Sequence, residues 1–159
     1  MSTYEDKFSH FLHNNCHFLG ILSDVNELND PELTHRLTVG GYRSSATVVF
    51  KMNSDHLTKG HYTILQRESS GDVEWFDPTG MLPPAEVVKW CEKNNFGYPD
   101  CMPFPVLAPD RLFLSGEMCA YYVRVRVWQE SLEAFQFKCY HCKVGDRTYF
   151  VSLGIDFTE

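Results

Sequence analysis

The chain has 159 residues, the size of one ordinary domain. Hydrophobic residues make up 43% and charged residues 22%, a composition that predicts a packed core and argues against a disordered chain. The 21 acidic residues outnumber the 14 lysines and arginines and give a formal net charge of -7, which argues against a general nucleic-acid-binding protein. No apolar run approaches the ~20 residues that cross a bilayer, so we expect no membrane helix.

The start of the chain and its cysteines bear on location and redox state. The segment from Met1 to Lys7 is polar and acidic, unlike a secretory signal, so we expect an intracellular protein. Six cysteines are present, and without a signal peptide reduced thiols are favoured over disulfides. Cys139 and Cys142 form one Cys-x-x-Cys pair, with no second pair at zinc-finger spacing. A zinc site would need a further ligand, so two thiols near a hairpin are favoured over a metal site.

Apolar periodicity predicts the elements of the first two thirds of the chain. A helical stripe over Tyr4 to His13 comes first, and an apolar run over 18–22 then leads to a helix N-cap signature at Ser23-Asp24. A hairpin loop at 68–71 and a turn at 77–80 are marked by Gly, Ser, Asp and Pro. Three strands and a helix are predicted over 45–51, 61–67, 72–77 and from Pro83-Pro84 to about Asn94.

The last third of the chain contains a long apolar stretch from Met118 to Trp128. Its tail from Val123 alternates with period 2, which by itself predicts a strand. Two further strands are predicted over 135–139 and 148–153. Because no repeat, low-complexity tract or linker separates these elements, we expect one α+β domain over residues 1–159, with a mixed central sheet flanked by helices.

His61 and Asp77 are a candidate catalytic base and its orienting acid. His61 opens the second predicted strand and Asp77 ends the third, and paired strands lie only ~5 Å apart. The hairpin therefore brings the two residues together. A carboxylate that accepts a hydrogen bond from an imidazole is the arrangement that orients a catalytic base. Taken singly, each residue also fits a structural role, His61 at a strand edge and Asp77 at the start of a turn.

Cys119 is the candidate nucleophile. It follows Ser115, a candidate helix cap, and Gly116, which permits an unusual backbone turn, and it precedes the small Ala120. At a helix N-terminus the macrodipole favours the thiolate, and adjacent amides can hold an oxyanion. The alternative is a buried core cysteine, since that is the commonest fate of a free thiol.

Four short segments follow one another in chain order: Phe18-Leu19-Gly20-Ile21 with Asp24, Gly60-His61-Tyr62, Trp75-Phe76-Asp77-Pro78-Thr79-Gly80 and Met118-Cys119-Ala120. Their order and spacing resemble the adenovirus maturation protease family (adenain), part of a larger cysteine peptidase group that includes proteases of ubiquitin-like proteins. The resemblance covers about residues 18–128 and leaves 130–159 as a C-terminal extension with a predicted hairpin. It implies a papain-like or adenain-like architecture in which His61 is the general base, Asp77 its orienting acid and Cys119 the nucleophile.

The resemblance also implies a helix where periodicity predicts a strand. The family would place Cys119 at the start of a buried central helix that runs to about Gln129. We favour this helix over a strand from Val123, because tertiary burial often overrides β propensity.

The oxyanion hole is where the sequence departs most from the family. Family members carry a Gln six or seven residues before the Cys, and here those positions hold Phe113 and Leu112. Arg111 is the nearest polar substitute, and Met118 is a second support candidate beside the nucleophile. Loss of one oxyanion donor costs about 10²–10³ in rate, so weak or absent activity is an open alternative. Ala120 also replaces the usual glycine.

The reaction implied by the resemblance is hydrolysis of a peptide or isopeptide bond through a thioester acyl-enzyme. Our leading hypothesis is a viral cysteine endopeptidase that cleaves precursor proteins at glycine-containing sites. The alternatives are a deubiquitinase or deconjugase of a ubiquitin-like modifier, and a protease-derived binding or structural protein. The expected partners are a protein substrate and, as a further candidate, a peptide activator. Because the chain is acidic, the DNA dependence of the adenoviral enzyme is not carried over, and we expect no cofactor and no membrane partner. The host cytoplasm, the nucleus and the virion are the candidate locations.

Overall fold

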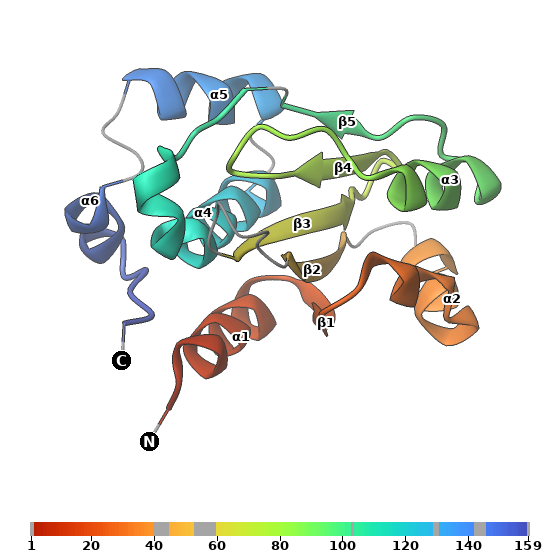
Figure 1. The fold of residues 1–159 in the computed structure, drawn as a ribbon, viewed down its shortest axis with the longest axis horizontal. Coiled ribbons are helices and arrows are strands. Elements are labelled where there is room, and N and C mark those ends of the chain that lie inside the picture. The colour runs from red at the N-terminus through yellow and green to blue at the C-terminus, as the bar shows by residue number, and fades with distance from the viewer. Residues whose placement is uncertain are drawn as a thin grey trace.

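A mixed five-stranded sheet lies at the centre of the computed structural model (Figure 1), which describes residues 2–39, 45–52, 60–102, 104–128, 131–141 and 146–158. The strands lie side by side in sequence order: β1 (His17–Leu22), β2 (Ala46–Met52), β3 (His61–Arg67), β4 (Val73–Phe76) and β5 (Asp100–Cys101). Neighbours among β2, β3 and β4 are antiparallel, whereas β1 and β5 add to the edges in parallel. The predicted hairpin between the strands over 61–67 and 72–77 is therefore confirmed.

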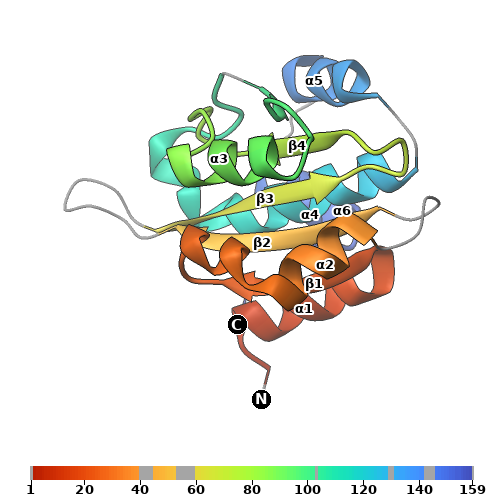
Figure 2. The same ribbon diagram turned by 90° about the vertical axis from the view of Figure 1, so that its right-hand side faces the viewer.

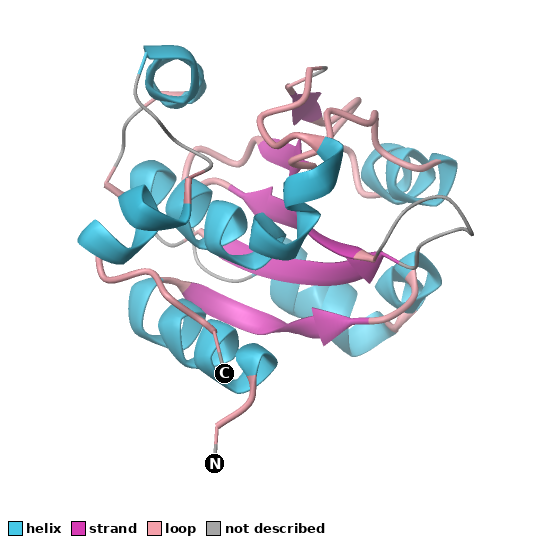
Figure 3. Ribbon diagram, turned by 60° about the vertical axis from the view of Figure 1, so that its left-hand side comes forward, coloured by secondary structure: helices cyan, strands magenta, loops and turns pink. Residues whose placement is uncertain are grey.

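Helices cover both faces of this sheet. Figure 2 shows α2 and α3 in front of the strands and α4 behind them, and Figure 3 shows helices across the face that carries α4. The helices are α1 (Tyr4–Asn15), α2 (Pro31–Val39), α3 (Ala85–Lys93), α4 (Ser115–Val127), α5 (Leu132–His141) and α6 (Arg147–Ser152), with short 3-10 helices η1 (Val25–Asn29) and η2 (Pro109–Leu114). The predicted α+β class, with a mixed sheet flanked by helices, is confirmed.

Alternate residues of the strands enter two separate apolar clusters. Ile64 and Phe76 belong to the cluster that contains α1 and α4, whereas Leu65 and Trp75 belong to the one that contains α2 and α3. Successive side chains of a strand point to opposite faces, so both faces of the sheet are buried. The ends of β3 and β4 are thereby fixed relative to α4, which matters for the site described below.

Helix α4 is buried on almost every side because it lies between the sheet, α1 and α5. Its first nine residues and Val125 are buried, as is typical of a helix enclosed in a core. The prediction of a helix over this segment is confirmed, and burial overrides the strand-like alternation from Val123. The helix begins at Ser115, four residues before the predicted start at Cys119.

The predicted strands over 135–139 and 148–153, and with them the C-terminal hairpin, are wrong: the chain forms α5 and α6 there. Short apolar runs do not distinguish a strand from a buried helix by periodicity alone. The missed signals are the caps, since Ser131 Oγ accepts from the Ala134 amide at 3.0 Å and Asp146 Oδ1 accepts from the Thr148 amide at 2.9 Å. The fully buried Phe135 packs edge-on against Phe76 and Tyr122.

Candidate active site

His61 and Asp77 meet at one end of the β3–β4 hairpin. Ile64 pairs with Phe76 across the two strands, which leaves Asp77 just past the end of β4 and His61 at the start of β3. The imidazole Nε2 and the carboxylate Oδ1 lie 3.0 Å apart. The side chain of His61 is 14% exposed and that of Asp77 4%. A carboxylate held this way fixes the orientation of the ring, and Nδ1 is the ring nitrogen that remains for a reacting group.

The turn after β4 holds the Asp77 carboxylate in place. Its Oδ1 also accepts from the Thr79 amide at 2.8 Å and from the Thr79 hydroxyl at 2.7 Å. The amide of Gly80 closes the turn on the Asp77 carbonyl. Gly80 has a φ of +80°, and a Cβ there would lie 2.8 Å from the carbonyl oxygen of Phe104. The sequence Asp-Pro-Thr-Gly is therefore required both for the turn and for the close approach of the neighbouring loop.

Cys119 lies on α4, against the residue that follows His61. Its Sγ donates to the carbonyl of Tyr62 at 3.4 Å, and the Tyr62 amide donates to Ser115 Oγ at 3.0 Å. One turn of α4 thus holds both backbone groups of Tyr62. In the described part of the chain, no hydrogen bond joins the Cys119 thiol to the imidazole of His61. The three predicted residues are gathered at one end of the sheet, with His61 and Asp77 in contact.

The surroundings of Cys119 favour the neutral thiol. The residue is fully buried, and burial raises its pKa well above the usual value, with the negative charges of Asp77 and Glu117 adding to the effect. Burial likewise raises the pKa of Glu117, whose side chain accepts a hydrogen bond from the Tyr4 hydroxyl. A thiol in this state is a weak nucleophile until a base removes its proton.

The early start of α4 changes the role predicted for its N-terminus. Cys119 is the fifth residue of the helix, so helix geometry directs its amide to the Ser115 carbonyl rather than to an oxyanion. The macrodipole acts mainly within the first turn, which Cys119 has left. Ser115 is buried and binds Tyr62 instead of capping the helix. Gly116 is helical, and its missing side chain makes room for Tyr4.

Arg111 and Met118, the two candidates to support the oxyanion hole, lie in different surroundings. Arg111 is exposed on η2, directly before α4. Met118 is fully buried in the apolar cluster with α1, and its thioether has no N–H or O–H to donate. Sequence reasoning missed Tyr4 and Glu117, which lie beside Cys119. The one available signal was Gly116, because a glycine inside a helix is often explained by a close contact.

The remaining cysteines do not form a metal centre in the part of the chain that the structure describes. Within it, no cluster of three His, Cys, Asp or Glu side chains has the arrangement to hold a metal ion. Cys16, Cys91, Cys101 and Cys139 are free thiols, as is Cys119, while Cys142, the partner in the Cys-x-x-Cys pair, lies outside the described residues. Among the described helices, none has the length and apolar character to cross a membrane.

Comparisons with known proteins relate the fold to a protease. No family model matches the sequence, and no curated protein matches it. The selenomethionine crystal structure of the ASFV pS273R protease is similar, with a TM-score of 0.57 and 12% identity over 82% of this chain and 60% of that chain. A second crystal structure of the ASFV pS273R protease has a TM-score of 0.49 and 13% identity over 86% of this chain and 56% of that chain. The chain therefore spans less than two thirds of these proteins, and it shares the fold of the first.

Proposed function

We propose that the protein is a cysteine peptidase in which Cys119 is the nucleophile, His61 the general base and Asp77 its orienting acid. The observation that carries the proposal is the 3.0 Å contact between His61 Nε2 and Asp77 Oδ1. It leaves Nδ1 for the nucleophile, and the Cys119 thiol binds the backbone of the next residue, Tyr62. The fold shared with a protease supports the same reading.

The proposed reaction divides hydrolysis into two steps. His61 takes the thiol proton, and the thiolate of Cys119 attacks the carbonyl carbon of the scissile bond. Asp77 stabilises the imidazolium, which returns the proton to the departing amine and leaves a thioester on the sulfur. Water, deprotonated by His61, then attacks the thioester, the C–S bond breaks to release the acid, and the Cys119 sulfur takes the proton back from His61. The thiol must first leave its hydrogen bond to the Tyr62 carbonyl.

The proposed substrate is a protein with glycine near the cut, such as a viral precursor. The resemblance to adenain supports this class, and the fold shared with the ASFV protease supports a protein substrate in general. A ubiquitin-like modifier ending in Gly-Gly presents the same small residues and is the competing substrate.

A second candidate function is a binding protein derived from a protease. The observation in its favour is the complete burial of Cys119, with a pKa raised well above the usual value. The positions where the family carries its Gln hold Leu112 and Phe113, neither of which has a polar side chain.

Covalent labelling with substrate-like probes separates these functions. The intact chain is incubated with a glycine-ended peptide electrophile and, separately, with a ubiquitin electrophile, and adducts are located by peptide mass spectrometry. A cysteine peptidase forms an adduct on Cys119 that is lost in His61→Ala and kept in Cys91→Ala, a matched change of a buried thiol far from the hairpin end. The two probes then distinguish precursor-type from modifier-type substrates. Absence of any adduct on the folded protein favours the binding function.

A further inference from the structure

The ring of Tyr4, in the first turn of α1, lies on the first turn of α4. Its hydroxyl donates to Glu117 and lies 3.5 Å from the carbonyl oxygen of Phe113. A Cβ on Gly116 would lie 2.8 Å from Cε1 of Tyr4, so the ring occupies the space that any side chain at this position would need. Glycine at 116 is therefore explained by this contact rather than by backbone conformation.

Helix geometry directs the Cys119 thiol toward the same place. Gly116 and Cys119 are three residues apart and share one face of α4. Side chains of a helix lean toward its N-terminus, so the thiol leans over the turn that contains Gly116. Consistent with this, the proximity of Cys119 contributes to the raised pKa of the Tyr4 phenol, after burial and Glu117.

Aromatic contacts of Tyr4 complete the enclosure of the Cys119 thiol. Tyr4 stacks on Tyr62 with ring centroids 6.1 Å apart and meets Phe157 edge-on at 5.8 Å. Tyr62 is also the residue whose carbonyl accepts from the Cys119 thiol. The thiol therefore lies between α4, the start of β3 and the first turn of α1, which accounts for its complete burial.

We propose that Tyr4 is an internal cover over Cys119, and that a substrate reaches the thiol only when the first turn of α1 moves away. The proposal rests on the proposed function only for the role of Cys119 as nucleophile. Movement of one turn is sufficient, because the rest of α1 is held by Phe8 and Leu12, both fully buried. Helix ends open locally at lower free-energy cost than core segments. Here the capping box of Thr3 and Asp6 stabilises the turn that has to open.

Native-state alkylation of the full chain tests the cover without requiring catalysis. The folded protein receives short pulses of iodoacetamide, and the rate at each cysteine is read by peptide mass spectrometry. Tyr4→Ala is expected to raise the rate at Cys119 about tenfold or more, because it removes both the covering ring and the hydroxyl bond to Glu117 that local opening must otherwise break. Tyr4→Phe, which keeps the ring, is expected to give a smaller rise. Cys91, fully buried in the other apolar cluster, reports global unfolding and is expected to stay unchanged.

Two further variants keep the test decisive. Gly116→Ala adds the methyl group that the Tyr4 ring excludes while favouring the helix, so it is expected to displace the ring and raise the Cys119 rate without altering any side chain of α1. Asn15→Ala removes a side-chain bond to the Phe11 carbonyl at the far end of α1 and is expected to leave the Cys119 rate within about twofold of wild type. An unchanged Cys119 rate in Gly116→Ala, a rise there shared by Cys91, or an equal rise in Asn15→Ala overturns the cover.

The experiments can reject the proposed cover and the proposed peptidase function independently of each other. If Tyr4→Ala exposes Cys119 to iodoacetamide but no glycine-ended probe reacts there, the cover stands and the peptidase function is lost. If the probe labels wild type and Tyr4→Ala at the same rate, the peptidase stands and the cover is lost.

Discussion

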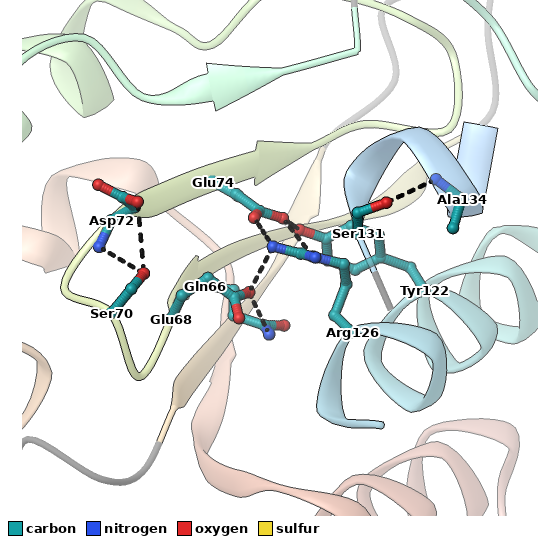
Figure 4. A network of polar contacts seen from close by, with 9 residues as sticks. All are labelled: Gln66, Glu68, Ser70, Asp72, Glu74, Tyr122, Arg126, Ser131 and Ala134. Atoms are coloured by element: carbon teal, nitrogen blue, oxygen red, sulfur yellow. Dashed lines mark hydrogen bonds and ion pairs between the residues drawn. The ribbon is translucent and has the colours of Figure 1, made fainter. Parts of the chain in front are cut away.

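The two ends of α4 each bury a carboxylate that accepts a hydrogen bond from a tyrosine, but their charges are balanced differently. At the N-terminal end Tyr4 donates to Glu117, and among the described residues no ion pair involves that carboxylate. At the C-terminal end Tyr122 donates to Glu74, which also pairs with Arg126 (Figure 4). One end is therefore held by a neutral donor and the other by a cation.

The difference separates a structural anchor, made of Glu68, Glu74 and Arg126, from the proposed reactive site at Cys119. Arg126 donates through Nε to Glu74 at 3.0 Å and lies 3.6 Å from Glu68, which Gln66 also binds (Figure 4). Buried charges are stable only when paired and hydrogen-bonded, and this end meets that condition. The other end leaves Glu117 beside the Cys119 thiol, where its charge opposes a thiolate.

Removal of the cation is the strongest test of the anchor. Arg126→Met leaves the Glu74 carboxylate buried without its ion pair, so we expect the free energy of unfolding to fall by about 3–5 kcal/mol in denaturant titrations. Lys51→Ala is the matched control, because its 3.7 Å pair with Glu5 is exposed and is expected to contribute less than about 1 kcal/mol. Equal losses in the two variants would show that burial of the pair has no special importance.

Glu68 makes the anchor sensitive to pH. Burial raises its pKa from 4.5 to about 7, with Glu74 adding to the rise and Arg126 opposing it. The folded state therefore holds this proton more tightly than the unfolded chain, and the free energy of unfolding falls as the pH rises from about 4.5 to about 7. We expect a fall of about 2 kcal/mol, measured by denaturant titration between pH 5 and 8.

Glu68→Gln is expected to flatten this pH dependence and to raise stability at pH 8. The raised pKa of Glu117 acts in the same direction, so part of the slope remains in the variant. Glu86→Gln, an exposed change on α3, serves as the control and keeps the full slope. A slope in Glu68→Gln equal to that of wild type contradicts the assignment.

Removing the hydroxyl of Tyr4 or of Tyr122 compares the two ends of α4 directly. Tyr4→Phe removes the hydroxyl that donates to the buried Glu117 carboxylate, and we expect a loss of about 2 kcal/mol in free energy of unfolding. Tyr122→Phe leaves Glu74 still bound by Arg126, so the expected loss is only about 1 kcal/mol although Tyr122 is the more buried ring. Denaturant titrations of both variants at pH 7 check the order. The reverse order would mean that burial of the hydroxyl decides the loss, not the charge balance.

The hairpin and the contact between His61 and Asp77 could be predicted from the sequence, because both follow from local signals. Strand periodicity and the short loop at 68–71, which contains Gly71, set the register of β3 and β4 within 17 residues of chain. The α+β class and the helical state of α4 were also predicted correctly, the latter only through the resemblance to adenain.

The elements that could not be predicted depend on distant packing. The C-terminal segments are helices because Phe135 and Phe150 reach the core from α5 and α6, which alternation within a short run does not reveal. The contact between Tyr4 and Glu117 joins residues 113 positions apart, so no local spacing indicates it. A buried Cys119 was one of the alternatives that the sequence left open, but no local signal indicates that Tyr4, more than a hundred residues earlier in the chain, covers one side of it.

The smallest expected effect concerns the neutral bonds between α4 and the start of β3. Ser115→Ala removes the acceptor of the Tyr62 amide and leaves a half-buried donor unpaired, which costs towards the low end of about 1–3 kcal/mol. Alanine favours the helix by about 0.5 kcal/mol, so the net loss in free energy of unfolding is expected to be about 1 kcal/mol. Ser70→Ala, in the exposed hairpin loop at the other end of β3, is the matched control and is expected to change stability by less than about 0.5 kcal/mol. Because the Tyr62 carbonyl holds the Cys119 thiol, Ser115→Ala is also expected to speed alkylation of Cys119, and a stability loss without that faster reaction would separate the packing of α4 from the closure of the site.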